Sequence, residues 1–224
     1  MTPPFVLASC ATSLDGYLDD GSGKRLVLSH PDDLARVDEI RATCDAILVG
    51  ANTVRRDDPR LLVRSDARVQ ERLRAGRAPQ PTKVTLTRTG NLDPGCAFFT
   101  AGPGARLVFS SGDASALAAR LGAAATVVAL PSEDGLFALL GELGRRGIAR
   151  LLVEGGSQVL TGFLALDLVH ELRVAIAPFF VGDADAPRVV GASRFPYDAK
   201  RRMHLDGVER VGDMVVATYH LRRP

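Results

Sequence analysis

The chain has 224 residues, of which 46% are hydrophobic and 24% charged, and this composition excludes a disordered or collagen-like protein. Lys and Arg total 28 against 26 Asp and Glu, so the net charge of +2 does not indicate a nucleic-acid-binding protein. No apolar stretch approaches the length of a membrane span, and Cys10, Cys44 and Cys96 are too scattered for a disulfide framework or a zinc site. We therefore expect a cytoplasmic globular protein that binds no metal, nucleic acid or membrane.

Short apolar runs alternate along the chain with segments whose apolar residues recur every three or four positions. The apolar runs predict strands at Phe5–Cys10, Ala46–Val49, Lys83–Thr87, Arg106–Ser110, Thr126–Leu130 and Arg150–Val153. The periodic segments predict helices at Pro31–Arg41, Ala114–Leu121, Gly135–Arg146 and Ser157–Leu166. This alternation indicates an α/β fold, with a mostly parallel sheet that helices cover on both faces.

The remaining segments predict an edge, a loop and a local charge. Leu168–Ala177 and Val211–His220 are predicted strands with no helix between them, which favours an antiparallel edge of the sheet. The polar segment Arg64–Pro81 is predicted to be a surface loop. Arg55–Arg88 contains ten basic and four acidic residues, a local excess of +6. This excess is either a solvated basic face or a field that attracts a phosphorylated small molecule.

The first candidate site follows the strand that ends at Val49. Gly50-Ala51-Asn52-Thr53 leads from this strand into a predicted helix start. In open α/β sheets, ligands bind beyond the carboxyl ends of the strands, and N–H groups at a helix N-terminus bind anions. An ordinary structural turn has the same composition, so both interpretations stand for this segment.

The second candidate site is the charged segment Arg55-Arg56-Asp57-Asp58-Pro59-Arg60-Leu61-Leu62-Val63-Arg64. Pro59 disfavours a helical conformation at Asp58, so we expect an ordered loop. Arginine side chains bind phosphate through paired hydrogen bonds, and carboxylates accept hydrogen bonds from ribose hydroxyls, so the segment has the groups of a sugar-phosphate pocket. A surface ion-pair cluster is the alternative.

The third candidate site is Leu151-Leu152-Val153-Glu154-Gly155-Gly156-Ser157, an apolar strand that leads into a helix beginning at Ser157. Two glycines let a ligand approach the backbone, and the helix N-terminus offers N–H donors to a pyrophosphate. Glu154 is expected at the carboxyl end of the strand, facing the crevice. The pattern is neither GxGxxG nor a P-loop, and a simple helix-entry turn is the alternative.

In their order along the chain, these segments resemble the reductase domain of the bifunctional deaminase/reductase of riboflavin biosynthesis and its free-standing archaeal and actinobacterial relatives. The resemblance rests on Ser13–Gly16, Leu34–Ala42, Asp45–Gly50, Thr53–Val54, Asp57–Leu61, Leu152–Ser157 and Leu168–Pro178. It implies one domain over residues 1–224 with a dihydrofolate-reductase-like three-layer fold, in a homodimer. It also implies NADPH-dependent reduction of 5-amino-6-(5-phosphoribosylamino)uracil to its ribitylamino product. Deamination is not expected of this chain, because the zinc signature H-x-E with P-C-x-x-C is absent.

The resemblance also assigns the substrate side of the site. Arg41 and Arg64 match family arginines at the substrate phosphoribosyl group, and Leu61 matches a position that touches substrate. Glu154 matches a substrate-site carboxylate, and Asp57 is expected to orient the ribose hydroxyls. Asp57 and Glu154 are therefore the predicted catalytic residues. The proton donor to the substrate nitrogen is open among Asp57, Glu154 and water.

The cofactor side is assigned in the same way. Asp57 and Thr53 match positions near the junction of ribose and nicotinamide, and Ala11 matches a backbone contact to the cofactor. Thr87 and Arg88 fall where the family binds the adenosine ribose and its 2′-phosphate, so Arg88 is expected to favour NADPH over NADH. The cofactor pyrophosphate is expected on Gly155, Gly156, Ser157, Gln158 and Val159.

Two alternatives stay open for the function. The loop Asp19–Arg25 contains Gly23-Lys24-Arg25 where the family often has a serine that touches substrate, so another pyrimidine, a pterin or a folate is a possible substrate. The second alternative is a nucleotide-binding relative without turnover. The joint presence of Arg41, Arg64, Asp57 and Glu154 argues against it.

Overall fold

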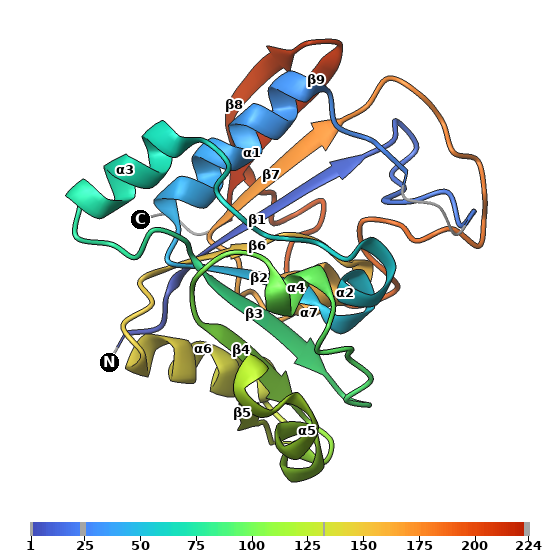
Figure 1. Cartoon of the computed structure of the whole chain (residues 1–224). Helices are drawn as coiled ribbons and strands as arrows, with labels where there is room; N and C mark the ends of the chain where they lie inside the picture. The colour runs from blue at the N-terminus through green and yellow to red at the C-terminus, as the bar shows by residue number, and fades with distance from the viewer. Residues whose placement is uncertain (1, 23–25, 132, 222–224) are drawn as a thin grey trace. The chain divides into compact units, whose positions relative to one another are not determined.

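The computed structural model describes residues 2–22, 26–131 and 133–221, and the chain forms two compact units (Figure 1). The first unit contains Asp38–Leu152 and the N-terminal residues up to Pro4. The second unit contains Phe5–Val37 and the chain from Val153 onward. Helix α1 (Pro31–Thr43) begins in the second unit and ends in the first, so its C-terminal turns belong to the same unit as the charged segment.

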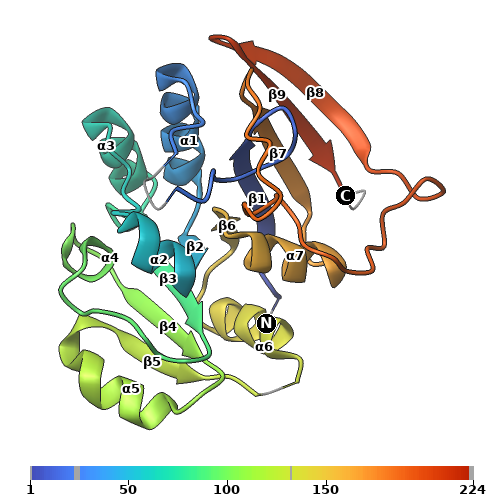
Figure 2. The same ribbon diagram turned by 90° about the vertical axis from the view of Figure 1, so that its right-hand side faces the viewer.

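The first unit is built on parallel strands. β2 (Ala46–Gly50), β3 (Thr82–Thr87), β4 (Arg106–Ser110) and β5 (Thr126–Ala129) pair in sequence order, and β6 (Arg150–Val153) neighbours β2 on its other side. Its helices are α2 (Ala51–Asp57), α3 (Asp66–Arg74), α4 (Ala97–Thr100), α5 (Ala114–Leu121) and α6 (Gly135–Arg145), with a 3-10 turn at Gly122–Ala124. In Figure 2, α5 lies beside β4 and β5.

The second unit combines parallel and antiparallel pairing. β1 (Phe5–Thr12) pairs in parallel with β7 (Glu171–Ile176), which pairs antiparallel with β9 (Met214–His220). β8 (His204–Val211) forms a hairpin with β9 and is the edge strand, as Figure 2 shows. α7 (Ser157–Ala165) is the second helix of this unit.

The core follows from the apolar runs and spacings of the sequence. All five residues of β2 are buried, as expected for a central strand of a parallel sheet. α6 buries Leu139 and Leu143, one turn apart, and α7 buries Leu160 and Phe163 in the same way. The strand ends that carry the polar candidate segments are therefore fixed by well-packed elements.

The predicted α/β class, with a mostly parallel sheet and an antiparallel edge, is confirmed, but two local predictions are wrong and one strand was not predicted. Arg64–Pro81 is not a loop throughout, since it contains α3, whose charged sequence hid its periodicity. Val211–His220 is not one strand, because Gly212 turns the chain with a φ of 61°. β8 was missed because seven of its eight residues are exposed or half-buried and leave no apolar pattern.

No helix among the described residues is long and apolar enough to cross a membrane. The three cysteines are all free thiols, with Cys10 and Cys44 buried and Cys96 half-buried. Burial raises the pKa of Cys10 to about 12 and also raises the pKa of Cys44. Both buried thiols are therefore protonated and poorly nucleophilic near neutral pH.

Candidate functional site

Contrary to the prediction, the charged segment is not a loop throughout, because residues 55–57 form the last turn of α2; residues 58–65, the charged loop, have an unusual backbone. Asp58 and Leu61 adopt left-handed conformations, with φ values of 41° and 47°, which cost energy for residues other than glycine. Asp58 is the C-cap of α2. Its Oδ1 accepts a hydrogen bond of 2.6 Å from the backbone N of Ala97, the first residue of α4. Contacts with other elements therefore hold the segment in this conformation. Asp58 also serves the fold, since its carboxylate caps α4.

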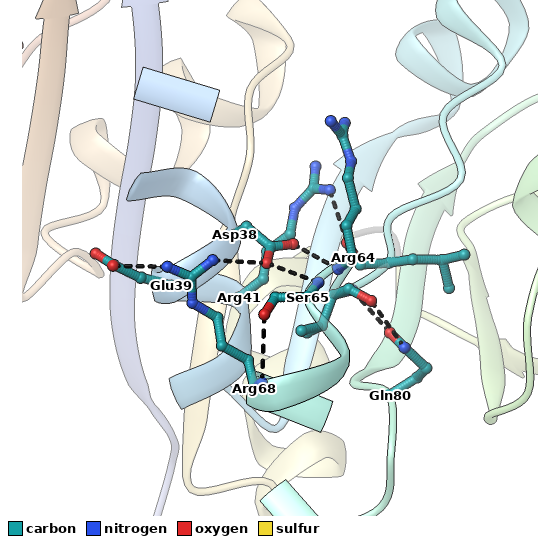
Figure 3. A network of polar contacts seen from close by, with 9 residues as sticks. Asp38, Glu39, Arg41, Arg64, Ser65, Arg68 and Gln80 are labelled. Carbon is teal, nitrogen blue, oxygen red and sulfur yellow. Dashed lines mark hydrogen bonds and ion pairs between the residues drawn. The ribbon is translucent and has the colours of Figure 1, made fainter. Parts of the chain in front are cut away.

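The end of this loop is fixed by the carboxylate of Asp38, which lies buried on α1. Its Oδ1 accepts a hydrogen bond of 2.6 Å from the backbone N of Arg64, and its Oδ2 accepts one of 3.2 Å from the backbone N of Ser65 (Figure 3). The guanidinium of Arg68 donates to the same Oδ2 at 3.0 Å and to Glu39 at 2.6 Å. Burial alone would lower the pKa of Arg68, but the hydrogen bonds to Asp38 and Glu39 raise it.

Two further side chains hold the middle of the loop. The buried amide of Gln80 accepts from the backbone N of Val63 at 2.8 Å and donates to its carbonyl oxygen at 3.0 Å. The Nη1 of Arg41 donates to the carbonyl oxygen of Leu62 at 3.1 Å. Three consecutive residues of the loop are thus bound through their main chain, which leaves little freedom to the backbone that carries Arg64.

The two arginines predicted at the substrate phosphate both belong to the first unit, Arg41 on α1 and Arg64 on the loop before α3. Figure 3 shows the guanidinium groups of Arg41 and Arg64 on the same side of the network, pointing away from the pair formed by Asp38 and Arg68. The side chain of Arg64 is exposed and that of Arg41 half-buried. Leu61, predicted to touch substrate, is only 2% exposed. Two guanidinium groups that project from the same side of a fixed network suit a phosphate monoester.

The predicted contacts to the nicotinamide side of the cofactor lie on α2. Thr53 and Asp57 are four residues apart on this helix and share one face. Asp57 is the last residue of the helix and is exposed, while Thr53 is half-buried. The two acidic residues of the charged segment therefore differ in position. The Asp58 carboxylate binds the backbone of α4, whereas Asp57 is exposed at the C-terminal end of α2.

The predicted contacts to the adenosine ribose and 2′-phosphate lie at the carboxyl end of β3. The hydroxyl of Thr87 accepts a hydrogen bond of 3.0 Å from the backbone N of Gly90, and the carbonyl oxygen of Thr87 accepts one of 3.2 Å from Ser111. The guanidinium of Arg120 donates to the carbonyl oxygen of Gly90. This turn presents the exposed side chain of Arg88, a position and charge suited to a phosphate.

The local basic excess is partly internal to the fold. Arg68 pairs with Asp38, and the buried Arg72 donates to the carbonyl oxygens of Ala42 at 2.8 Å and Cys44 at 2.7 Å. The buried Lys83 donates to carbonyl oxygens at the C-terminal end of α4. Of the ten basic residues, these three stabilise the first unit, so the total of +6 overstates the charge that a ligand would meet.

In the second unit, the glycine turn after β6 has the conformation that the sequence suggested. Gly155 and Gly156 have φ values of 79° and 85°, and α7 begins at Ser157 with Gly156 as its N-cap. A Cβ at Gly155 would meet no atom within 4 Å, so space is open beside the turn. A glycine N-cap offers no side chain to the N–H groups of the first turn, and these groups suit a pyrophosphate. The predicted pyrophosphate residues thus fit such a group.

The other predicted residues of the second unit lie on or beside its strands. Glu154 directly follows β6 and is half-buried. Ala11 lies near the end of β1, in register with Ala175 of β7. Gln158 is exposed and Val159 is buried on α7, so only the backbone of Val159 is suited to contact an anion. Gly23-Lys24-Arg25, at the possible substrate loop, lie outside the described residues.

The motif Ser13–Gly16 has a structural explanation that sequence reasoning did not supply. The Asp15 carboxylate accepts hydrogen bonds from the backbone N of Val181 at 3.1 Å, the backbone N of Gly182 at 2.8 Å and the hydroxyl of Ser13 at 2.5 Å. Desolvation acts against ionisation, but these hydrogen bonds lower the pKa of Asp15 to about 2. Asp15 therefore ties the segment after β1 to the segment after β7.

Sequence reasoning also missed the residues that hold the charged loop. The sequence pattern could have identified Asp38. It lies four residues after Leu34 and three before Arg41 on the predicted helix, so it shares their face. A carboxylate on a face with apolar residues needs a partner inside the protein. Gln80 gave no such signal, since its partners are backbone atoms of Val63 and nothing in its neighbourhood marks them.

Comparison with known proteins decides the family. The model of the RibD C-terminal domain matches residues 4–217. The chain belongs to this family. A 2,5-diamino-6-ribosylamino-4(3H)-pyrimidinone 5′-phosphate reductase of Archaeoglobus fulgidus is 34% identical over 222 residues, which cover 98% of this chain and 99% of the relative. The protein of the same name from Methanothermobacter thermautotrophicus is 33% identical over 98% and 99% of the two chains.

Solved structures of RibD-family proteins show the same fold. A pyrimidine reductase-like protein from Corynebacterium diphtheriae superposes with a TM-score of 0.83 at 21% identity, over 99% of this chain and 93% of the other. Acinetobacter baumannii RibD superposes with a TM-score of 0.79 at 25% identity, over 99% of this chain and 59% of the RibD chain. The predicted membership of the riboflavin-biosynthesis reductases is confirmed, and the named relatives are reductases of that pathway.

Proposed function

We propose that this RibD-family protein reduces the ribosyl group of a phosphoribosylaminopyrimidine to a ribityl group, with NADPH as the reductant. The observation that carries this proposal is the pair Arg41 and Arg64: Arg41 on α1 donates to the carbonyl oxygen of Leu62, and Arg64 follows two residues later on a loop held at three consecutive residues. The full-length relatives named as phosphorylated ribosylaminopyrimidinone reductases support it. We treat residues 1–224 as one reductase domain, since one family model spans 4–217.

The chemistry requires the sugar ring to open before reduction. As the ring C1′–O bond breaks, the amine nitrogen loses its proton and forms a C=N bond to C1′, and the ring oxygen takes up a proton. When bound, NADPH would supply a hydride to C1′, and the imine nitrogen would take up a proton. Arg41 and Arg64 would hold the phosphate at the far end of the sugar and so fix C1′ in position. Asp57 would orient the ribose hydroxyls, and Glu154 would hydrogen-bond the pyrimidine.

The cofactor contacts are proposed in the two units separately. Gly155–Val159 would bind the pyrophosphate through backbone N–H groups at the start of α7. Arg88 would pair with the 2′-phosphate, with Thr87 beside it on the adenosine ribose. In the first unit, Thr53 and Asp57 would contact the junction of ribose and nicotinamide. In the second unit, the backbone of Ala11 would contact the cofactor. We expect a cytoplasmic homodimer, in keeping with three free thiols and with exposed apolar side chains on the edge hairpin, Leu205, Val208 and Val215.

The pyrimidine is the part of the substrate that needs a direct test. A Thermotoga maritima relative in fold carries the name of a reductase of 5-amino-6-(5-phosphoribosylamino)uracil. The archaeal relatives carry the name of the 2,5-diaminopyrimidinone, which has an amino group where the uracil has an oxygen. The chain is more similar in sequence to the archaeal relatives than to the Thermotoga protein. The diaminopyrimidinone is therefore a candidate substrate beside the uracil.

The test is to follow NADPH absorbance with each of the two phosphoribosylaminopyrimidines and with dihydrofolate. Oxidation with either pyrimidine and not with dihydrofolate supports the proposal, and the ratio of the two kcat/KM values identifies the physiological pyrimidine. Oxidation with dihydrofolate alone would assign a folate reductase instead. Tight NADPH binding without oxidation of any of the three would indicate a binding protein without turnover.

A further inference from the structure

We infer that Asp38 is a positioning residue for the substrate-phosphate arginine Arg64, an inference that rests on the proposed function. The carboxylate lies on α1, in the same matched segment as Arg41, but the resemblance assigned Asp38 itself no contact with substrate or cofactor. It binds the backbone N of Arg64 and of Ser65, and these two bonds fix the point where the charged loop enters α3. The inference concerns the backbone of Arg64, since its guanidinium points away from Asp38 (Figure 3).

The Asp38 carboxylate makes its hydrogen bonds to groups inside the protein. Its side chain is 6% exposed, and both of its oxygens accept hydrogen bonds. Arg68 donates to Oδ2 at 3.0 Å and balances the charge. A buried carboxylate with these partners does not reach a substrate, so any effect of Asp38 on catalysis must pass through the loop.

The loop needs such support because its backbone is strained and its outer residues are exposed. Leu61 has a positive φ, which a side-chain-bearing residue adopts only when surrounding contacts enforce it. Gln80 holds Val63 and Arg41 holds the carbonyl of Leu62, but Arg64 itself is held by Asp38. If the bond to Asp38 is lost, only a fraction of the molecules has the conformation that presents Arg64. The apparent Kd for phosphate then equals the intrinsic Kd divided by that fraction.

Charge and position predict opposite results for the variant Asp38→Asn. Removal of a negative charge close to a phosphate site would by Coulomb's law strengthen anion binding. Loss of a charged acceptor for the Arg64 backbone would weaken it, because a neutral amide accepts more weakly and turns an NH₂ group toward Arg68. The sign of the change therefore separates the positioning role from a general effect of charge.

The experiment compares Asp38→Asn with Asp45→Asn in the full chain. Asp45 is a matched control, because its carboxylate also accepts backbone hydrogen bonds, from Ala149 at 3.0 Å and Arg150 at 2.9 Å, before β2 rather than at the charged loop. We expect Asp38→Asn to raise KM for the phosphorylated pyrimidine about tenfold, with kcat within twofold and the Kd for NADPH unchanged. Asp45→Asn should change none of the three.

A double variant tests whether the effect passes through Arg64. Arg64→Ala removes the side chain that Asp38 is inferred to position, so adding Asp38→Asn to Arg64→Ala should raise KM by less than twofold further. Additive tenfold effects would overturn the inference, because they would show that Asp38 acts independently of Arg64. A KM for Asp38→Asn equal to or below that of the wild type would overturn it as well.

A binding measurement keeps this inference separable from the proposed function. The Kd of ribose 5-phosphate is measured by calorimetry for the wild type, Asp38→Asn, Arg64→Ala and the double variant. Weaker, non-additive binding in the variants supports the positioning role even if no pyrimidine is reduced. Turnover by the wild type with unchanged KM and Kd in Asp38→Asn leaves the proposed function intact and overturns the inference. Absence of ribose 5-phosphate binding to the wild type, together with absence of turnover, overturns both.

Discussion

The two anion-binding segments proposed in this protein are built by different means. In the first unit, the charged loop (residues 58–65) is fixed by side chains from distant elements. Asp38, Arg41 and Gln80 are each bound to its main chain. In the second unit, the turn Gly155-Gly156 is fixed by its own backbone, through two consecutive positive φ values and the start of α7. The first design presents charged side chains and the second presents backbone N–H groups.

This difference predicts different responses to mutation. A segment that binds an anion through arginine side chains depends on individual charges and on the residues that orient them. A segment that binds through backbone N–H groups depends on conformation, so a single methyl group in place of a glycine hydrogen is enough to disturb it. Four variants test this comparison, in order of the expected effect.

The largest effect is expected from Arg64→Ala. Loss of a charge-assisted hydrogen bond to the substrate phosphate should lower kcat/KM for the phosphorylated pyrimidine about 100-fold. The Kd for NADPH, measured by fluorescence titration, should stay within twofold. Arg60→Ala is the control, because it removes an equal charge from the same exposed loop. Equal losses in the two variants would show that the loop acts by its overall field and not through a contact of Arg64.

The next effect is expected from Arg88→Ala, at the carboxyl end of β3. The ratio of kcat/KM with NADPH to kcat/KM with NADH should fall about 30-fold, because the paired charge on the 2′-phosphate is lost while NADH has no such group. Arg74→Ala, an exposed arginine on α3, serves as the charge-matched control. An unchanged ratio in Arg88→Ala would remove this residue from the cofactor site.

Gly155→Ala tests the backbone design of the second unit. The φ of 79° is unfavourable for alanine and costs about 1–2 kcal/mol of stability. Gly147→Ala is matched, since Gly147 has a φ of 78° and, like Gly155, no atom within 4 Å of an added Cβ. Both variants should lose similar stability, but only Gly155→Ala should weaken NADPH binding, about tenfold. Similar NADPH affinity in both would show that the turn does not face the cofactor.

The sequence predicted the parts of this protein that local pattern determines. β2 was predicted because four consecutive apolar residues, Ala46–Val49, fill a central strand, and the start of α7 was predicted because two glycines precede Ser157. The fold class and three candidate segments followed from such patterns. The support of the charged loop did not, because the bond from Asp38 to Arg64 joins residues 26 positions apart and leaves no local periodicity. Leu61 illustrates the same limit, since its positive φ is imposed by tertiary contacts.

The smallest effect on activity is expected at Lys83, whose side chain supports α4 in the first unit. Its Nζ donates to the carbonyl oxygens of Phe98 at 3.1 Å and Ala101 at 2.7 Å, while Asp58 caps the other end of this short helix. Lys83→Met would leave these carbonyls without that donor and should lower the free energy of unfolding. Burial, with a contribution from Arg106, lowers the pKa of Lys83 to about 8.

The lowered pKa makes this loss depend on pH. Between about pH 8 and the ordinary value of 10.5, the unfolded chain binds more protons at Lys83 than the folded protein does, so raising the pH stabilises the wild type relative to Lys83→Met. The stability deficit of the variant should therefore be smallest at pH 7 and larger at pH 10, by about 2 kcal/mol. Urea unfolding of both proteins at the two pH values measures this difference. A deficit that shrinks toward pH 10 would mean that the charged ammonium is favoured at this site and that the carbonyls of α4 compensate fully for its burial.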